Sequence, residues 1–251
     1  MKTRGRVTVW AVCFWLVVWE LAALAMDQQL FLVAPHTVLV RLGALILTTE
    51  FWYSVCFSLL RIGGGFLLAV ILGSLFAALA ARFSWLRDLL HPLLMTIKAV
   101  PVASFIILAL VLLPSRNLAV LIAFLMAMPV IFTNVLEGIQ STDRALLEMA
   151  QVYALPPGRT IRYIYLPQIQ PFFLSALSIS AGFAWNSGVA AEVIGMRAGS
   201  IGALLQQAKT FLDTPDLFAW TLTIVVLSIL FEKLVFWLAK LAFRRAERMV
   251  P

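Results

Sequence analysis

The stretch VCFSLLRIGGGFLLAVILGSLFAALAA, residues 55–81, decides the fold class. A helix needs roughly 20 mostly apolar residues to cross the hydrocarbon core of a bilayer, and this run is longer than that. Strands are excluded because the run is too long for one and does not alternate with a period of two. We therefore expect a membrane-spanning helix at about Val55–Ala81.

Five further apolar stretches extend the pattern to six predicted spans, and so to an all-α integral membrane protein. They lie at about Val7–Met26, Leu89–Leu113, Leu118–Leu136, Pro171–Ile194 and Leu217–Trp237. The first stretch imitates a secretory signal. It is longer than a usual signal core and contains Glu20, so we expect an uncleaved helix.

The composition supports a bilayer and one domain over residues 1–251. Hydrophobic residues make up 63% of the chain and charged residues 12%, whereas a soluble domain of this size needs more polar surface. The net charge of +7 lies at the ends of apolar runs, which indicates membrane topology and not nucleic-acid binding. Cys13 and Cys56 lie inside apolar runs without metal-ligand spacing, so no metal site is expected.

The basic residues assign an orientation to the spans, because Lys and Arg are enriched on the cytoplasmic side. With a cytoplasmic N-terminus, the inner segments hold Lys2, Arg4, Arg6, Arg82, Arg87, Arg144, Arg159, Arg162, Lys233, Lys240, Arg244, Arg245 and Arg248. The outer segments hold Arg41, Arg116, Arg197 and Lys209. The asymmetry predicts that both termini are cytoplasmic, which an even number of spans permits.

Two outer connections are expected to contain short helices. The stretch Asp27–Glu50 includes PHTVLVRLGALIL, which reads as an amphipathic helix near the membrane surface. The stretch Gly195–Asp216 is rich in Gly and Gln, and we expect a short helix or a re-entrant turn there.

The inner segment Glu137–Pro167 contains TDRALLEMAQVYALPPGRTIRYIYLP, residues 142–167. Thr142 is expected to cap a helix, and Asp143 then lies where the helix dipole favours an anion. The resulting short helix over Asp143–Tyr153 carries apolar side chains at helical spacing: Ala145, Leu146, Met149 and Tyr153. This side either binds a partner protein or packs back on the protein's own spans.

A turn and a second short helix are expected to follow. Pro156 and Pro157 prevent continuation of the first helix, and Gly158 permits a sharp turn. Pro157 is suited to start a second helix toward Tyr165, which Leu166-Pro167 would end before the fifth span.

This segment resembles the EAA motif of ABC importer permeases, the inner-membrane subunits of binding-protein-dependent transport systems. Glu148, Ala150, Ile164, Leu166 and Pro167 match the motif in residue and spacing. Met149 replaces its second Ala. Ala154 stands where Gly is usual, and Gly158 is the candidate to take over the turn.

The resemblance covers about residues 54–245. It includes SLLRIGGGFLLAVILG (residues 58–73), HPLLMTIKAVP (residues 91–101), Glu192-Val193-Ile194-Gly195 and Glu232-Lys233. The branch it resembles contains the permeases for nitrate, alkanesulfonate, taurine, bicarbonate and thiamin-precursor pyrimidines.

The resemblance implies a type I importer in the bacterial inner membrane, with a homodimer of six-helix permeases. Two cytoplasmic ATPase subunits carry ATP and Mg, and a periplasmic or lipid-anchored binding protein delivers the solute. This chain then needs no cofactor. ATP binding closes the ATPase dimer and drags the short helix as a rigid body, which switches the spans between inward and outward openings. The ATPase-coupling residues are then Arg144, Leu146, Leu147, Glu148, Met149, Ala150, Tyr153, Ala154, Gly158, Leu166 and Pro167.

Polar residues inside spans are candidates for the translocation pathway or its gate. They are Arg61, Lys98, Pro101, Ser104, Asn186, Ser187 and Glu192. Arg61 either contacts an anion or gate, or pairs between helices, and Pro101 either forms a hinge or only kinks the third span. Asn186 and Ser187 are favoured as lining residues. Glu192 is expected to contact the binding protein or to pair with a basic residue such as Arg197.

Other functions fit the residues less well. A membrane enzyme would need clustered Asp, Glu or His, and the acids here are scattered. A secondary transporter or channel would show repeats or charged relays, and neither is present. The run Gly63-Gly64-Gly65 lacks the Lys-Ser/Thr of an ATP-binding loop, so it is interpreted as a close helix contact. The transported solute cannot be read from the sequence.

Overall fold

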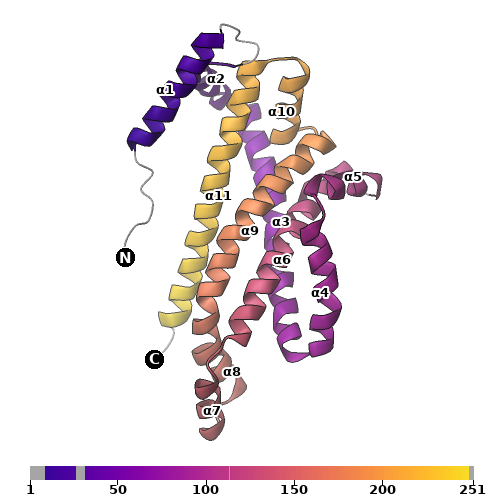
Figure 1. The fold of residues 1–251 in the computed structure, drawn as a ribbon, viewed down its shortest axis with the longest axis vertical. Helices are drawn as coiled ribbons and strands as arrows, with labels where there is room; N and C mark the ends of the chain where they lie inside the picture. Colours follow the sequence, from indigo (N-terminus) through magenta and orange to yellow (C-terminus); the bar gives the residue numbers. More distant parts are fainter. Residues whose placement is uncertain (1–8, 27–31, 113, 249–251) are drawn as a thin grey trace.

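The computed structural model describes residues 9–26, 32–112 and 114–248, and every regular element in these ranges is helical (Figure 1). The α-helices are α1 (Val9–Met26), α2 (Pro35–Ile46), α3 (Thr49–Arg82), α4 (Ser84–Ala99), α5 (Val102–Leu112), α6 (Leu118–Gln140), α7 (Arg144–Val152), α8 (Pro157–Thr160), α9 (Leu166–Gly195), α10 (Ile201–Thr210) and α11 (Thr214–Arg248). One 3-10 turn, η1 (Ser115–Asn117), precedes α6, and a π-helix, η2 (Ile161–Tyr165), joins α8 to α9.

The helices α3, α6 and α9 form the centre of the bundle, and small residues bring their backbones close together. A Cβ atom on Gly65 of α3 would overlap the carbonyl oxygen of Val120 in α6. A Cβ atom on Gly188 of α9 would lie 2.7 Å from Cγ1 of Ile62 in α3. The expected close helix contact is therefore confirmed for Gly65, whereas Gly64 faces open space.

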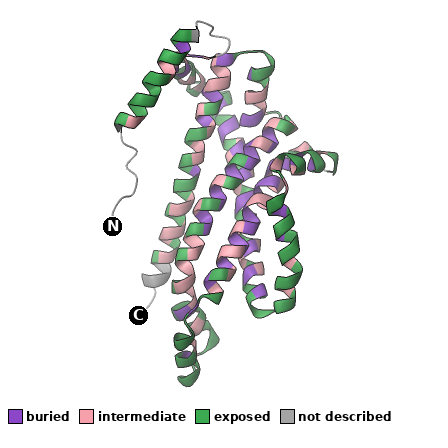
Figure 2. Cartoon of the chain, in the orientation of Figure 1, coloured by how far each residue is buried: buried purple, intermediate pink, exposed green. Residues whose placement is uncertain are grey.

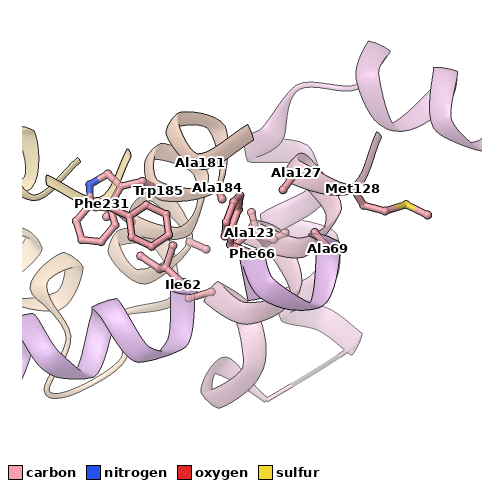
Figure 3. Packing of buried hydrophobic residues seen from close by; sticks show 14 of the residues in the cluster. Ile62, Phe66, Ala69, Ala123, Ala127, Met128, Ala181, Ala184, Trp185 and Phe231 are labelled. Carbon is pink, nitrogen blue, oxygen red and sulfur yellow. The ribbon is translucent and has the colours of Figure 1, made fainter. Parts of the chain in front are cut away.

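A buried tryptophan fastens the last helix to this centre. Trp185 of α9 is fully buried, and its Nε1 donates a hydrogen bond of 3.1 Å to the carbonyl oxygen of Ile224 in α11. Figure 3 shows Trp185 beside Phe231 of α11, with Ile62 and Phe66 of α3 next to them. The rings of Phe66 and Phe231 meet edge to face, with centroids 5.5 Å apart. Burial of these large rings and the satisfied indole N–H hold α11 against α3 and α9.

The predicted third span is broken. α4 and α5 meet at an angle of 106°, and the break falls at Val100 and Pro101. Val100 has extended backbone angles (φ −84°, ψ 132°), because a residue before proline is disfavoured in the helical region. The bend expected from Pro101 within the stretch of about Leu89–Leu113 is therefore confirmed.

Four helical segments in the described part of the chain are long and apolar enough to cross a membrane. They are Thr49–Arg82, Ser115–Gln140, Pro157–Gly195 and Thr214–Arg244, and the α4–α5 pair is a fifth candidate if its bent halves count as one span. Each matches a predicted apolar stretch. α1 is a shorter apolar helix, and the first two residues of its predicted span lie outside the described residues.

The two short helices predicted in the outer connections are confirmed as α2 and α10. Both lie opposite the end that carries α7 and α8 (Figure 1). Arg41 of α2 forms an ion pair with Asp216 of α11, in which Nη2 donates to Oδ2 at 2.9 Å. Nδ1 of His36 in α2 lies 2.8 Å from Oε1 of Glu20 in α1. Polar contacts thus connect α2 to α1 and to α11.

The packing of α3 against α6 predicts opposite effects for two adjacent glycines. Gly65→Ala should destabilise the protein by roughly 1–3 kcal/mol, because the new methyl group meets the backbone of Val120. Gly64→Ala should leave the stability unchanged or slightly raised, because the new Cβ would meet no neighbouring helix or side chain within 4 Å. Thermal unfolding in detergent measures both variants, and equal effects would contradict this account of the helix contact.

Candidate functional site

The first site is the segment that projects beyond the bundle, and its leading helix is α7 (Figure 1). Asp143 caps α7, and its Oδ1 accepts a hydrogen bond of 2.9 Å from the backbone N–H of Ala145. The prediction that Thr142 is the cap is wrong by one residue. Thr142 is buried, and its hydroxyl donates to the carbonyl oxygen of Gly138 at 3.4 Å instead. A carboxylate at this position also stabilises the positive end of the helix dipole.

The start of α7 is tied to the first turn of α9. The backbone N–H of Asp143 donates to Oε1 of Gln168 at 2.9 Å. Nearby, a Cβ atom on Gly138 would lie 3.1 Å from Cβ of Phe172, so α6 and α9 approach closely beside this bond. The segment is therefore connected to two central helices where it leaves the bundle.

The end of α7 is fixed by a turn at Ala154, which has a left-handed backbone (φ 49°). The N–H of Leu155 donates to the carbonyl oxygen of Ala150 at 2.9 Å, and the N–H of Ala154 donates to that of Gln151 at 3.0 Å. This pair of bonds is the Schellman arrangement, whose left-handed residue is usually Gly. The idea that Gly158 takes over the turn is wrong, because Gly158 lies within α8 and its φ is not positive.

The second short helix does not stop before the fifth span. α8 starts at Pro157, as predicted, but η2 joins it to α9, so the helix runs from Pro157 to Gly195. Leu166-Pro167 therefore starts α9 and does not end a separate piece. Pro167 directly follows the π-helix η2, where the regular α-helical hydrogen-bond pattern is already interrupted.

The predicted contact side of α7 is exposed (Figure 2). Leu146 is 37% exposed, Met149 42% and Tyr153 74%, and Arg144 and Glu148 are also exposed. Of the coupling residues on α7, Leu147 is half-buried and only Ala150 is buried. This side does not pack back on the protein's own spans, so it is available to another protein.

The candidate pathway residues of the third span lie around its break. Lys98 is exposed in the last turn of α4 and lines two cavities against α6, of about 160 and 210 Å³. Pro101 and Ser104 are exposed at the break and in the first turn of α5, and the N–H of Ser104 donates to the carbonyl oxygen of Pro101 at 3.0 Å. Lys98 therefore places a cation beside open space between α4 and α6, next to the break.

The two predicted lining residues of α9 point differently. Asn186 is exposed, whereas Ser187 is buried and its hydroxyl donates to the carbonyl oxygen of Phe183 at 2.5 Å. Of these two residues, only Asn186 has a side chain that is accessible from outside the helix bundle.

The second site is a buried polar cluster around Glu192, at the end of the bundle opposite α7. Glu192 is 2% exposed, so the predicted contact with a binding protein is wrong for this conformation. Its Oε2 accepts a hydrogen bond of 2.7 Å from the hydroxyl of Ser58 and one of 3.4 Å from the N–H of Gly202. The same hydroxyl accepts the N–H of Ile201 at 3.1 Å. The carboxylate thus holds the N-terminus of α10 against α3 and α9. The positive end of the α10 dipole also favours a negative charge at this position.

Arg61 of α3 lies within electrostatic range of Glu192, and Arg197 and Arg116 lie within range of Arg61. Its guanidinium group lies over the ring of Phe57, 5.1 Å from the centroid. The Nε and Nη2 atoms of Arg61 are buried without a hydrogen-bond partner in the described part of the chain. The predicted Glu192–Arg197 pair is not formed, because Glu192 turns to Ser58 and Gly202.

Sequence reasoning missed Ser58, Gly202 and Gln168. Ser58 and Gly202 carry no charge and lie on helices far apart in the chain. The one available sequence signal for Gly202 is its place two residues after Ser200, which caps α10. In the structure, a Cβ atom on Gly202 would lie 2.5 Å from Cβ of Glu192, so only glycine fits there. Among the described residues, no group of His, Cys, Asp and Glu is placed to hold a metal ion.

The comparison with protein families gives the decisive observation. Residues 65–248 match the family described as the binding-protein-dependent transport system inner membrane component. The chain belongs to this family. It is therefore a transport permease subunit of an ABC importer and not an enzyme.

Named relatives of the permease agree with this assignment. A probable ABC transporter permease protein of Brucella melitensis is 29% identical over 202 residues, which cover 80% of this chain and 82% of the relative. A putative aliphatic sulfonates transport permease of Bacillus subtilis is 28% identical over 222 residues, covering 88% and 80%. The taurine transport system permease of Escherichia coli is 25% identical over 220 residues, covering 85% and 80%.

The left-handed turn at Ala154 predicts that Ala154→Gly stabilises the end of α7. A left-handed backbone costs a residue with a Cβ about 1–2 kcal/mol of folding free energy. The variant regains only part of this free energy, because glycine also has more conformational freedom in the unfolded chain. Amide hydrogen exchange at Leu155 reports on the turn and should slow several-fold. Gly158→Ala, which adds a methyl group in open space, should leave that exchange rate unchanged. Faster exchange in Ala154→Gly would count against the turn described here.

The cluster around Glu192 predicts that alanine substitutions at two nearby serines have different effects on stability. Ser58→Ala removes a donor to a buried carboxylate and an acceptor for Ile201, so it should destabilise the permease by about 1–3 kcal/mol. Ser54→Ala should be neutral or stabilising, because the buried Oγ of Ser54 has no partner among the described residues. Unfolding curves of the two purified variants test the difference, and indistinguishable curves would rule it out.

Proposed function

We propose that the permease works as a homodimer in the bacterial inner membrane, each copy of which binds one cytoplasmic ATPase subunit through α7 and α8. A binding protein delivers the solute on the opposite side. The exposed side of α7 is the observation that carries this proposal: Leu146, Met149 and Tyr153 are apolar or aromatic, exposed and held on a helix with both ends fixed. Exposed apolar groups on an ordered projection favour a protein partner.

A coupling element must be stiff, because a flexible one would absorb the movement of its partner. The Asp143–Gln168 bond fixes the start of α7, and the Schellman turn fixes its end. From α8 the helix continues into α9 without a loop. These features support transmission of ATPase closure to the spans as a rigid-body movement.

The charge distribution supports six spans with both termini in the cytoplasm. This topology requires that the α4–α5 pair and α1 both cross the bilayer, in addition to the four long segments. Basic residues gather toward the α7 end, at Arg82, Arg87, Arg144 and Arg159, as expected for a cytoplasmic side.

The relatives support a small anion or organic solute as cargo. One is named for aliphatic sulfonates and another for taurine, and both kinds of molecule carry a sulfonate group. We therefore propose a solute of this class for the permease. Selection of the individual solute falls mainly to the binding protein.

A charge reversal on α7 tests the proposed docking. In a reconstituted importer, Glu148→Arg should abolish the stimulation of ATP hydrolysis by the loaded binding protein, because it puts a bulky cation into the contact. The permease itself should remain folded, since Glu148 is exposed.

Asp88→Arg provides the matched control. Asp88 is an exposed acid on α4 near the same end of the molecule, but outside the α7–α8 segment. Its reversal should leave the stimulation unchanged. Normal stimulation in Glu148→Arg would show that α7 does not bind the ATPase through this side.

A further inference from the structure

We infer that Arg61, with Arg197 and Arg116 near it, forms a binding subsite for a small oxyanion at the end of the bundle opposite α7. The inference deepens the proposed import of an anion, and its role in transport rests on that proposal. The binding itself stands on the arrangement of charges and unpaired donors described next.

One of the two oxygens of Glu192 is already engaged within the fold. Oε2 of Glu192 accepts bonds from Ser58 and from the N–H of Gly202, at the positive end of α10. Oε1 of Glu192 is buried without a hydrogen-bond partner in the described ranges, and Arg61 experiences this one carboxylate together with the like charges of Arg197 and Arg116. The local charge of the four groups is positive by two, and an anion would reduce it.

The donors of Arg61 lack acceptors. Both Nε and Nη2 are buried, and no hydrogen-bond partner for them lies in the described ranges. Nε of Arg197 is likewise buried without a hydrogen-bond partner in the described ranges. The ring of Phe57 covers one face of the Arg61 guanidinium but offers no oxygen atom. A buried charged donor without an acceptor is costly, so such a group calls for an ion or water that the chain itself does not provide.

The geometry of these donors favours an oxyanion. Nε and one Nη of a guanidinium form a planar fork that binds two oxygens of a carboxylate, sulfonate or phosphate at once. Arg61 lies roughly 18 Å along α3 from its first residue, at 1.5 Å per residue, and thus well inside the bundle end. Arg116 in η1 is exposed, which extends the positive field to the surface.

The test measures binding of methanesulfonate to the full chain purified in detergent, by calorimetry against chloride at equal ionic strength. Wild-type protein should bind the probe saturably. Arg61→Gln should weaken binding at least tenfold, and Arg61→Lys, which keeps the charge and loses the fork, should give an intermediate value. Lys209→Gln, which removes an exposed cation of α10 at the same end, should bind as wild type.

Unfolding without the probe separates binding from a structural role. Because Arg61→Gln removes an unpaired charge, it should unfold at the same temperature as wild type or at a higher one. Lower stability together with unchanged binding would overturn the inference, as would the absence of saturable binding to wild type. Failure here would leave ATPase stimulation and the Glu148→Arg result untouched, so the two proposals fail separately.

The oxyanion has two sources, a dissolved solute or a lipid phosphate, and competition distinguishes them. If phosphatidylglycerol added to the delipidated protein displaces methanesulfonate from wild type, the subsite takes lipid headgroups. If only soluble sulfonates compete, it takes the solute. Both outcomes retain an oxyanion subsite that depends on Arg61.

Discussion

The close approach of α3, α6 and α9 is the constraint on which the other elements depend. In lipid the hydrophobic effect does not drive helices together. Close contact between backbones, which small residues permit, therefore supplies much of the attraction between helices. Gly65 against Val120 and Gly188 against Ile62 set the spacing of the three helices. That spacing places Ser58 and Glu192 within hydrogen-bond distance, and it brings Gly138 against Phe172 where the α7 segment leaves. The two ends of the protein are thus positioned by one set of contacts.

Sequence reasoning succeeded where the chemistry is local. Apolar length located α3, α6, α9 and α11, proline predicted the bend at Pro101, and amphipathic spacing predicted α2. The helical spacing of Leu146, Met149 and Tyr153 likewise identified the side of α7 that is exposed. In each case the physical cause lies within a few residues of the feature it produces.

The failures have a common physical origin as well. Whether Ala154 adopts a left-handed conformation depends on the carbonyl groups that α7 offers, and its side chain gives no sign of it. The partners of Glu192 come from α3 and from the start of α10, so neither was visible from the residues around Glu192. A formal charge suggested a surface role for this carboxylate, whereas the fold uses it as an internal cap.

The uninterrupted helix from Pro157 to Gly195 has a mechanical consequence. At 1.5 Å per residue its 39 residues extend roughly 60 Å, about twice the thickness of the hydrocarbon core. One end adjoins the projecting α7, and the other reaches Glu192 and α10. α9 packs against α6 from Phe172, beside Gly138, to Gly195, beside Leu118, so a tilt applied at the projecting tip would move α6 and α9 together. Under the proposed coupling, the far end with Glu192 and α10 would therefore move with the tip.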